Sequence, residues 1–185
     1  MKIRPYQEKD KDDVRFICLN SEGPNTDSAN TNRFVLNTFC DYYLEQESEN
    51  CFVAVDENDK AIGYIICAEN YDKYYSCFIK EYLPRFRFYQ FIRRREAKLS
   101  SVPQRNHKAE YPAHLHIDVL PEYQRMGIGS KLVDTLCAHL KSKGISGVML
   151  TTGTINERGR NFYKKYGFTE LEIYKDDAVY GLKIL

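Results

Sequence analysis

The distribution of apolar and polar positions predicts alternating strands and helices along most of the chain. Short runs of β-branched and aromatic residues predict strands, and apolar residues three and four apart predict amphipathic helices. The DEND segment between the second and third strands suits a hairpin. The predicted strands cover residues 2–6, 51–55, 61–69, 114–119, 147–151, 169–174 and 179–185. The predicted helices cover residues 10–20, about 31–46, 126–143 and about 157–166.

Residues 71–110 interrupt this pattern. The spacing of Tyr74 and Tyr82 before Pro84, and of the apolar residues from Phe88 onward, is helical. Pro84 breaks the helical pattern, and the later run SVPQRNHKAEYP has the composition of a loop. We therefore expect a partly helical insertion between two strands.

The insertion also carries most of the uneven charge. It holds ten Lys and Arg against four Asp and Glu, with five Tyr and four Phe, whereas the whole chain has a net charge of only +1. Such a segment can bind nucleic acid, wall an anion pocket, or form an amphipathic helix whose arginines reach solvent. The run RFRFYQFIRRRE favours the amphipathic helix. The pI of about 7.6 and the lack of a nucleic-acid-binding motif argue against such a partner.

Bulk composition indicates an ordinary globular protein. A length of 185 residues fits one domain, residues 1–185. No uncharged apolar run is long enough for a membrane span, so we expect no membrane partner. The six cysteines include no CxxC pair, which predicts free thiols in a reducing compartment. We therefore expect a cytoplasmic protein.

A segment containing two glycines follows the strand predicted at 114–119. The first turn of a helix presents unpaired N–H groups and partial positive charge, and both favour phosphate oxygens. Glycines would let an anion approach this backbone, although a tight turn and close helix packing would explain them as well. The segment fits neither GxxxxGK[ST] nor GxGxxG. The residues predicted to hold a diphosphate are Gln124, Arg125, Met126, Gly127, Ile128, Gly129 and Ser130.

Two segments together resemble the GNAT superfamily of acetyl-CoA-dependent N-acetyltransferases. VLPEYQRMGIGSKLV resembles its Q/R-x-x-G-x-G/A motif, and NERGRNFYKKYGF resembles its Asn…(L/F)-Tyr-x-K-x-G-F segment. The order of predicted elements is similar to that fold over nearly the whole chain. The resemblance implies an α/β domain with a mixed, mostly antiparallel sheet splayed between two strands, about four flanking helices and the insertion. More narrowly, HLHIDVLP resembles the acetyltransferase-like domain of O-GlcNAcases and its stand-alone bacterial relatives.

The resemblance also assigns roles in the transfer of an acetyl group. It implies that acetyl-CoA is the co-substrate and that the backbone of residues 124–130 binds its pyrophosphate. The free amide of Val119 would polarise the thioester carbonyl, and Asn156 would meet the pantetheine arm. Tyr163 would be the general acid that protonates the thiolate, although a tyrosine there could also be part of the core. Gly159 and Arg160 lie where the family usually has a small residue, often alanine, so the chain departs from the family pattern where the CoA arm would fit.

The general base is left open between two residues. His114, His116 and Asp118 alternate along one strand and therefore share one face. The family often uses a strand Glu that reaches a water, and some of its arylalkylamine acetyltransferases use a strand His pair. No Glu lies in this strand, so His116 or Asp118 would serve. Three such side chains could also bind zinc in a metal-dependent hydrolase, but no further ligand follows nearby. We expect no metal.

The sequence therefore predicts an N-acetyltransferase that moves an acetyl group to a primary amine by direct attack on the thioester. The main alternative is a catalytically silent module that binds CoA or a partner protein. A metal-dependent hydrolase is the third reading. The acceptor, a small-molecule or peptide amine, is not specified by any motif, and a homodimer is compatible with the chain.

Overall fold

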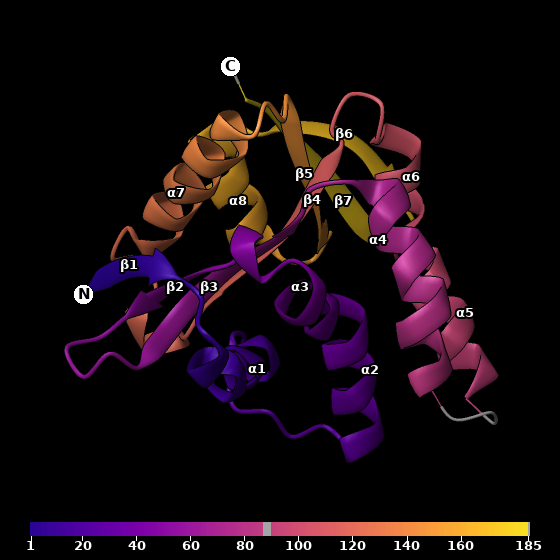
Figure 1. Cartoon of the computed structure of the whole chain (residues 1–185), viewed down its shortest axis with the longest axis horizontal. Coiled ribbons are helices and arrows are strands. Elements are labelled where there is room, and N and C mark those ends of the chain that lie inside the picture. The colour runs from indigo at the N-terminus through magenta and orange to yellow at the C-terminus, as the bar shows by residue number, and fades with distance from the viewer. Residues whose placement is uncertain (87–89, 185) are drawn as a thin grey trace.

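A mixed, twisted sheet forms the centre of the molecule (Figure 1). The computed structural model describes residues 1–86 and 90–184. In these residues seven strands form one sheet in the order β1-β2-β3-β4-β5-β7-β6, and neighbours are antiparallel except for β4 and β5. The predicted fold class is confirmed. The strands are β1 (Lys2–Pro5), β2 (Phe52–Val55), β3 (Ala61–Ala68), β4 (Ala113–Val119), β5 (Gly147–Gly153), β6 (Thr169–Tyr174) and β7 (Asp177–Lys183).

The parallel pair β4–β5 separates soon after it forms. Its register includes only Ala113 opposite Val148 and His114 opposite Met149. On its other side, β4 stays paired with β3 as far as Val119, which lies opposite Gly63. The second half of β4 therefore has one open edge. This is the splay that the sequence predicted, and the polar side chains of β4 lie along it.

Helices cover both faces of the sheet. Those before β2 are α1 (Lys11–Asn20), α2 (Ala29–Phe39) and α3 (Asp41–Gln46), and they pack on one face. The other face is covered by α7 (Ile128–Ser142) and α8 (Glu157–Tyr166). Figure 1 shows the two groups on opposite sides of β3 and β4.

The insertion between β3 and β4 is largely helical, as predicted. It forms a side wall next to α2 and α3 (Figure 1). Its helical elements are α4 (Tyr71–Cys77), a π-helical turn η3 (Phe78–Tyr82), a 3-10 turn η4 (Leu83–Arg85), α5 (Phe91–Leu99) and α6 (Val102–His107). Further 3-10 turns in the described residues are η1 (Glu8–Asp10), η2 (Ser48–Asn50) and η5 (Pro121–Tyr123).

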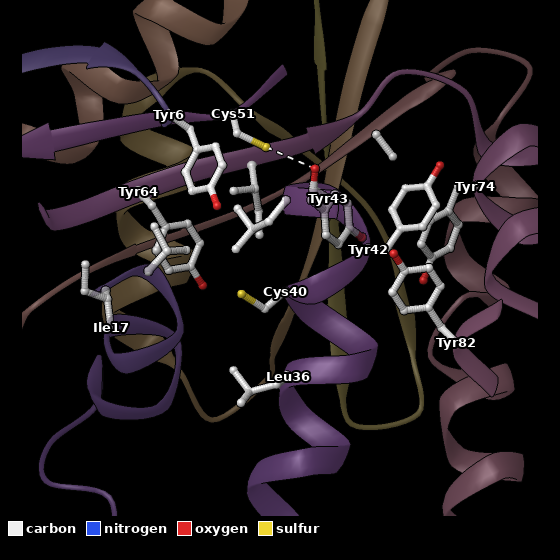
Figure 2. Close-up of a cluster of buried hydrophobic side chains, with 14 of the residues drawn as sticks. Tyr6, Ile17, Leu36, Cys40, Tyr42, Tyr43, Cys51, Tyr64, Tyr74 and Tyr82 are labelled. Atoms are coloured by element: carbon white, nitrogen blue, oxygen red, sulfur yellow. Dashed lines mark hydrogen bonds between the residues drawn. The ribbon is translucent and has the colours of Figure 1, made fainter. Parts of the chain in front are cut away.

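Each face of the sheet has its own apolar cluster. The cluster beneath α1 to α4 is rich in tyrosine. Figure 2 shows Tyr6 and Tyr64 on one side of it and a separate group of Tyr42, Tyr43, Tyr74 and Tyr82 on the other. The ring of Tyr42 lies 5.5, 4.7 and 5.6 Å from those of Tyr43, Tyr74 and Tyr82. Edge-to-face packing of this kind adds to the stabilisation from burial. On the opposite face, the buried side chains of α7 recur at helical spacing and pack on the sheet: Ile128, Leu132, Val133, Leu136 and Leu140.

Several element boundaries differ from the sequence prediction. The helix predicted at about 31–46 is two helices, because Cys40 between α2 and α3 leaves helical geometry (φ −133°, ψ −62°). The loop predicted after residue 100 contains α6, with Pro103 in its first turn, where proline is tolerated. The helix predicted from residue 126 begins at Ile128. Phe88 and Leu185 lie outside the described residues.

Two compositional predictions can be compared with the structure. The six cysteines are free, as predicted. In the described part of the chain, no helix has both the length and the apolar character needed to cross a membrane.

Candidate active site

A cavity of about 750 Å³ opens where β4 and β5 separate. Its walls come from β4, the glycine-containing segment, β5, α8 and the segment after α1. Most residues predicted for the site line it, whereas the Met126 side chain is 61% exposed and is not part of the lining. The predicted residues brought together here are His116, Asp118, Val119, Gln124, Arg125, Gly127, Ile128, Gly129, Ser130, Asn156 and Tyr163.

The segment from β4 to α7 presents a run of free backbone amides. Arg125 and Gly127 both have left-handed backbone conformations, with φ of 63° and 76°. In the part of the chain that the structure describes, no carbonyl or side chain accepts from the amides of residues 125–130. The amide of Gln124 instead donates to the Pro121 carbonyl at 3.3 Å, and that of Lys131 to Gly127 at 3.2 Å. The free donors therefore begin one residue later than the predicted segment.

The two glycines of this segment are required for different physical reasons. Gly127 needs its left-handed φ, and a Cβ there would meet no atom within 4 Å. A Cβ at Gly129 would lie 3.1 Å from Cζ of Phe162, so this glycine allows α7 and α8 to pack closely. The helix-packing explanation that the sequence left open therefore holds for Gly129. Both glycines line the cavity, together with Ile128 and Ser130.

Val119 turns its backbone toward the open edge of β4. The Leu120 amide donates to the Ile62 carbonyl at 3.0 Å, so this opposite pair is hydrogen-bonded. Because hydrogen-bonded and non-hydrogen-bonded pairs alternate in an antiparallel ladder, Val119 faces away from β3. Its side of the strand is the one that β5 has left. The Val119 N–H therefore points to the cavity that it lines.

Asp118 is a carboxylate on the open half of β4, and it lines the cavity. The Tyr64 hydroxyl donates to its Oδ2 at 2.5 Å, across the β3–β4 pair. Burial raises the pKa of Asp118 to about 6, and the charge of Glu22 adds to the increase, while hydrogen bonds from Tyr64 and Ser21 oppose it. Asp118 is therefore ionised at neutral pH but retains appreciable basicity.

The surroundings of the two histidines are less favourable for a general base. Nε2 of His116 lies 3.1 Å from the Tyr43 hydroxyl, and burial lowers its pKa to about 4. His114 is enclosed by aromatic rings, with Tyr74 at 4.6 Å, and neither of its ring nitrogens has a partner among the described residues. Burial, followed by the charge of His116, lowers the pKa of His114 to about 3.

Nothing in this arrangement favours the metal-dependent hydrolase. Within the described ranges, no three His, Cys, Asp or Glu side chains lie close enough to hold a metal ion. His116 and Asp118 instead pair with separate tyrosine hydroxyls, Tyr43 and Tyr64.

Tyr163 reaches the cavity from α8, on the face of β4 opposite to Asp118. Its side chain is 8% exposed and packs with the α7–α8 cluster, next to Phe168 and Tyr180. No described residue forms a hydrogen bond with its hydroxyl. Burial, followed by the charge of Asp118, raises the pKa of Tyr163, so the phenol stays protonated at neutral pH.

Asn156 has a clear local role at the start of α8. Its side-chain oxygen accepts from the Gly159 amide at 2.9 Å, and its Nδ2 donates to the Thr152 hydroxyl at 3.2 Å. A Cβ at position 159 would lie only 2.8 Å from that Nδ2, so the cap itself explains this glycine. One N–H of Asn156 is left for a ligand, and its contact with pantetheine remains a prediction.

The cavity also contains residues that the sequence did not single out. Ser21 and Glu22, which follow α1, lie on the side of Asp118. Arg158 and Lys165 project from α8. Within the described structure, neither of these two cations nor Glu22 forms an ion pair. Only the chain fold reveals these residues, because charged positions on a helix or loop carry no motif.

Comparison with known proteins agrees with this geometry. The chain belongs to the Acetyltransferase (GNAT) family, whose sequence profile matches residues 18–168. It is 25% identical, over 134 residues, to an uncharacterised N-acetyltransferase of Methanocaldococcus jannaschii; the match covers 72% of this chain and 45% of that protein. The chain therefore spans about half the length of this curated relative.

Solved structures share the whole fold. The crystal structure of SsHAT is 25% identical, with a TM-score of 0.86, and the match covers 100% of this chain and 98% of SsHAT. A PaiA N-acetyltransferase of Thermoplasma acidophilum, solved in complex with coenzyme A, is 17% identical with a TM-score of 0.62, and 98% of each chain is covered.

Proposed function

We propose that this protein is an acetyl-CoA-dependent N-acetyltransferase that acetylates a primary amine. The observation that carries the proposal is the run of free amides at residues 125–130, which opens into the same cavity as the Val119 N–H. Free amides at a helix start suit a diphosphate, and a lone amide at a strand edge suits a carbonyl oxygen. Membership of the GNAT family and a relative bound to coenzyme A support the same co-substrate.

The basic side chains near the free amides fit the remaining phosphate charge of CoA. Arg125, Arg158 and Lys165 line the cavity, and in the described structure none of them is paired with a carboxylate. Their charge would add to that of the α7 N-terminus. When bound, acetyl-CoA supplies the acetyl thioester, and the protein supplies orientation, a hydrogen bond to the carbonyl and proton transfer.

Val119 would stabilise the charge that develops on the acetyl oxygen. Its N–H is fixed by the β3–β4 ladder and needs no rearrangement to donate. A donor held in this way, in a site shielded from water, is worth about 10²–10³ in rate.

Asp118 is the better candidate for the base. An alkylamine has a pKa of about 10.4 and arrives protonated at neutral pH. A base works best when its own pKa lies near the working pH. The pKa of Asp118 is raised to about 6, whereas that of His116 is lowered to about 4. Asp118 would therefore take the ammonium proton, directly or through water.

Tyr163 would complete the reaction as the general acid. The amine nitrogen forms a bond to the acetyl carbon, and the carbon–sulfur bond breaks. The nitrogen gives up its second proton to water, the departing sulfur receives the phenol proton, and solvent then returns a proton to the phenolate. The raised pKa of Tyr163 keeps that proton in place until the thiolate forms. Asp118 and Tyr163 lie on opposite faces of β4, so the two proton transfers would occur on opposite sides of the thioester.

The acceptor side of the cavity favours a cation. Glu22 and Asp118 both line this region, and their charges act on each other. Two carboxylates would attract an ammonium group and disfavour an acidic acceptor. The proposed acceptor class is therefore a cationic primary amine, on a small molecule or a peptide.

The deciding experiment is CoA release over a panel of amines. The panel would include a polyamine, a lysine peptide, a peptide with a free α-amino terminus and an amino sugar, with and without acetyl-CoA. We expect release with at least one cationic amine. Binding of acetyl-CoA with no release over the whole panel would instead identify a silent CoA-binding module.

A further inference from the structure

The Gln124 side chain connects two parts of the cavity. Its Nε2 donates to the Val119 carbonyl at 2.7 Å and to the Ser21 carbonyl at 3.0 Å. The backbone amide of Gln124 donates to Pro121, which fixes the point from which the side chain extends. Both N–H groups of the carboxamide are therefore used by the protein itself.

Both acceptors are carbonyls that the regular structure leaves open. Ser21 caps the C-terminus of α1, where the last carbonyls have no partner within the helix. Val119 faces the open edge of β4, where β5 offers no donor. Both residues are half-buried, and one carboxamide supplies a donor to each of their carbonyls, which would otherwise lack a partner among the described residues.

The two carbonyls belong to different functional regions. Ser21 precedes Glu22 on the acceptor wall, and its hydroxyl also contacts Asp118. Val119 is the residue whose N–H is proposed to bind the acetyl oxygen. The Gln124 side chain contacts both regions. Its hydrogen bond to Ser21 joins two residues that are 103 positions apart in the sequence.

We propose that Gln124 is a positioning residue that holds the acceptor wall, Ser21 and Glu22, against the end of β4. Its side chain fixes the distance between the base, the amine and the amide that binds the acetyl oxygen. This inference rests on the proposed function. It differs from a role in holding CoA, because the free amides that suit the pyrophosphate begin at Arg125.

The test compares two substitutions at this position. Gln124→Met keeps the length of the side chain and removes both donors, whereas Gln124→Arg keeps several N–H donors. At saturating acetyl-CoA, we expect Gln124→Met to lower kcat/KM for the amine about tenfold and to change the Kd of acetyl-CoA less than about twofold. Gln124→Arg should recover most of that loss. An equal loss in both variants, or a loss confined to acetyl-CoA affinity, would overturn the inference.

A second measurement separates this inference from the proposed function. Amide hydrogen exchange at Gly23 and Asn25 reports on the acceptor wall, because both amides donate to Asn20, at 3.1 and 2.9 Å. We expect faster exchange there in Gln124→Met than in the wild type or Gln124→Arg, with α7 unchanged. If no amine supports turnover, the proposed function fails, but this comparison still decides the role of Gln124. Unchanged exchange in Gln124→Met would refute it.

Discussion

Asp118 and His116 occupy neighbouring positions on the same face of β4, yet burial changes their pKa values in opposite directions. A buried carboxyl resists ionisation, so the pKa of Asp118 rises to about 6. A buried imidazole resists protonation, so the pKa of His116 falls to about 4. Histidine is the stronger base of the two in water, but His116 is the weaker base in this strand. The same burial therefore supports Asp118 over His116 as the proposed base, because it disfavours the charged form of each group.

If Asp118 is the base, activity should depend on its ionisation. We expect kcat/KM to rise with pH through about 6, because the carboxylate form accepts the proton. Tyr64→Phe removes a hydrogen bond that lowers the pKa, so the rise should move to higher pH. Glu22→Gln removes a neighbouring negative charge that raises the pKa, so the rise should move to lower pH. Initial rates from pH 4.5 to 9 would measure both shifts.

The opposite directions of these shifts distinguish the two candidate bases. If His116 were the base, the rise would lie near pH 4, where its pKa lies. Neither Tyr64→Phe nor Glu22→Gln would then move the profile as predicted. With an alkylamine acceptor, whose pKa is about 10.4, the amine stays protonated over this range and does not create the feature near pH 6.

Removal of the Tyr163 hydroxyl should affect the chemical step and leave binding intact. We expect Tyr163→Phe to lower kcat about 100-fold, since general acid catalysis contributes on the order of 10²–10⁴. The Kd of acetyl-CoA should stay within about twofold, because the ring remains packed. Steady-state kinetics and calorimetry would measure the two quantities. Tyr166→Phe is the matched control on α8, because the Tyr166 hydroxyl already donates to Asp134 at 2.5 Å. An unchanged kcat in Tyr163→Phe would exclude Tyr163 as the general acid.

The junction between β4 and α7 shows how a short segment leaves backbone amides without partners. The 3-10 turn η5 and two left-handed residues, Arg125 and Gly127, turn the chain before α7 begins. This turn prevents the first-turn amides of α7 from finding carbonyls upstream. The amides are free because of backbone geometry, so side-chain changes should matter chiefly where they alter that geometry.

Gly127 tests this dependence on backbone geometry. Its φ of 76° suits Gly, is tolerated by Asn and is strongly disfavoured for β-branched residues. We expect Gly127→Val to weaken acetyl-CoA binding about tenfold and to lower stability by about 1–2 kcal/mol. Gly127→Asn should reduce both acetyl-CoA affinity and stability much less than Gly127→Val. Because a Cβ at this position would meet no protein atom within 4 Å, equal losses in the two variants would contradict an origin in backbone strain.

Sequence patterns predicted these elements well where local preference decides them. The glycine-containing segment and the strands of β-branched residues lie close to their predicted positions. The break at Cys40 and the helix α6 were missed, because tertiary packing and a first-turn proline outweighed local composition. The contacts of Tyr64 with Asp118 and of Gln124 with Ser21 span 54 and 103 positions, so no local pattern could predict them.

In the molecule as a whole, the splay brings together two clusters that the sheet otherwise separates. Asp118 bonds to Tyr64, which belongs to the cluster covered by α1 to α4, whereas Tyr163 belongs to the cluster covered by α7 and α8. Only at the open edge of β4 can groups from both faces reach one ligand. The insertion extends the first face with rings such as Tyr74 and Phe78, and its buried residues support β4 from the side of the histidines.

Because the cavity lies between two clusters, a ligand in it should stabilise the entire fold. Acetyl-CoA at 100 times its Kd contributes about 2.7 kcal/mol, which for a domain of this size raises Tm by about 5–10 °C. A thermal denaturation series with increasing acetyl-CoA would measure the increase, and a chelator alone should leave Tm unchanged. Dephospho-CoA should stabilise less, because it lacks a phosphate that Arg125, Arg158 and Lys165 would bind. A lower Tm with the chelator, together with an unchanged Tm with acetyl-CoA, would favour a metal site over the amide-lined site.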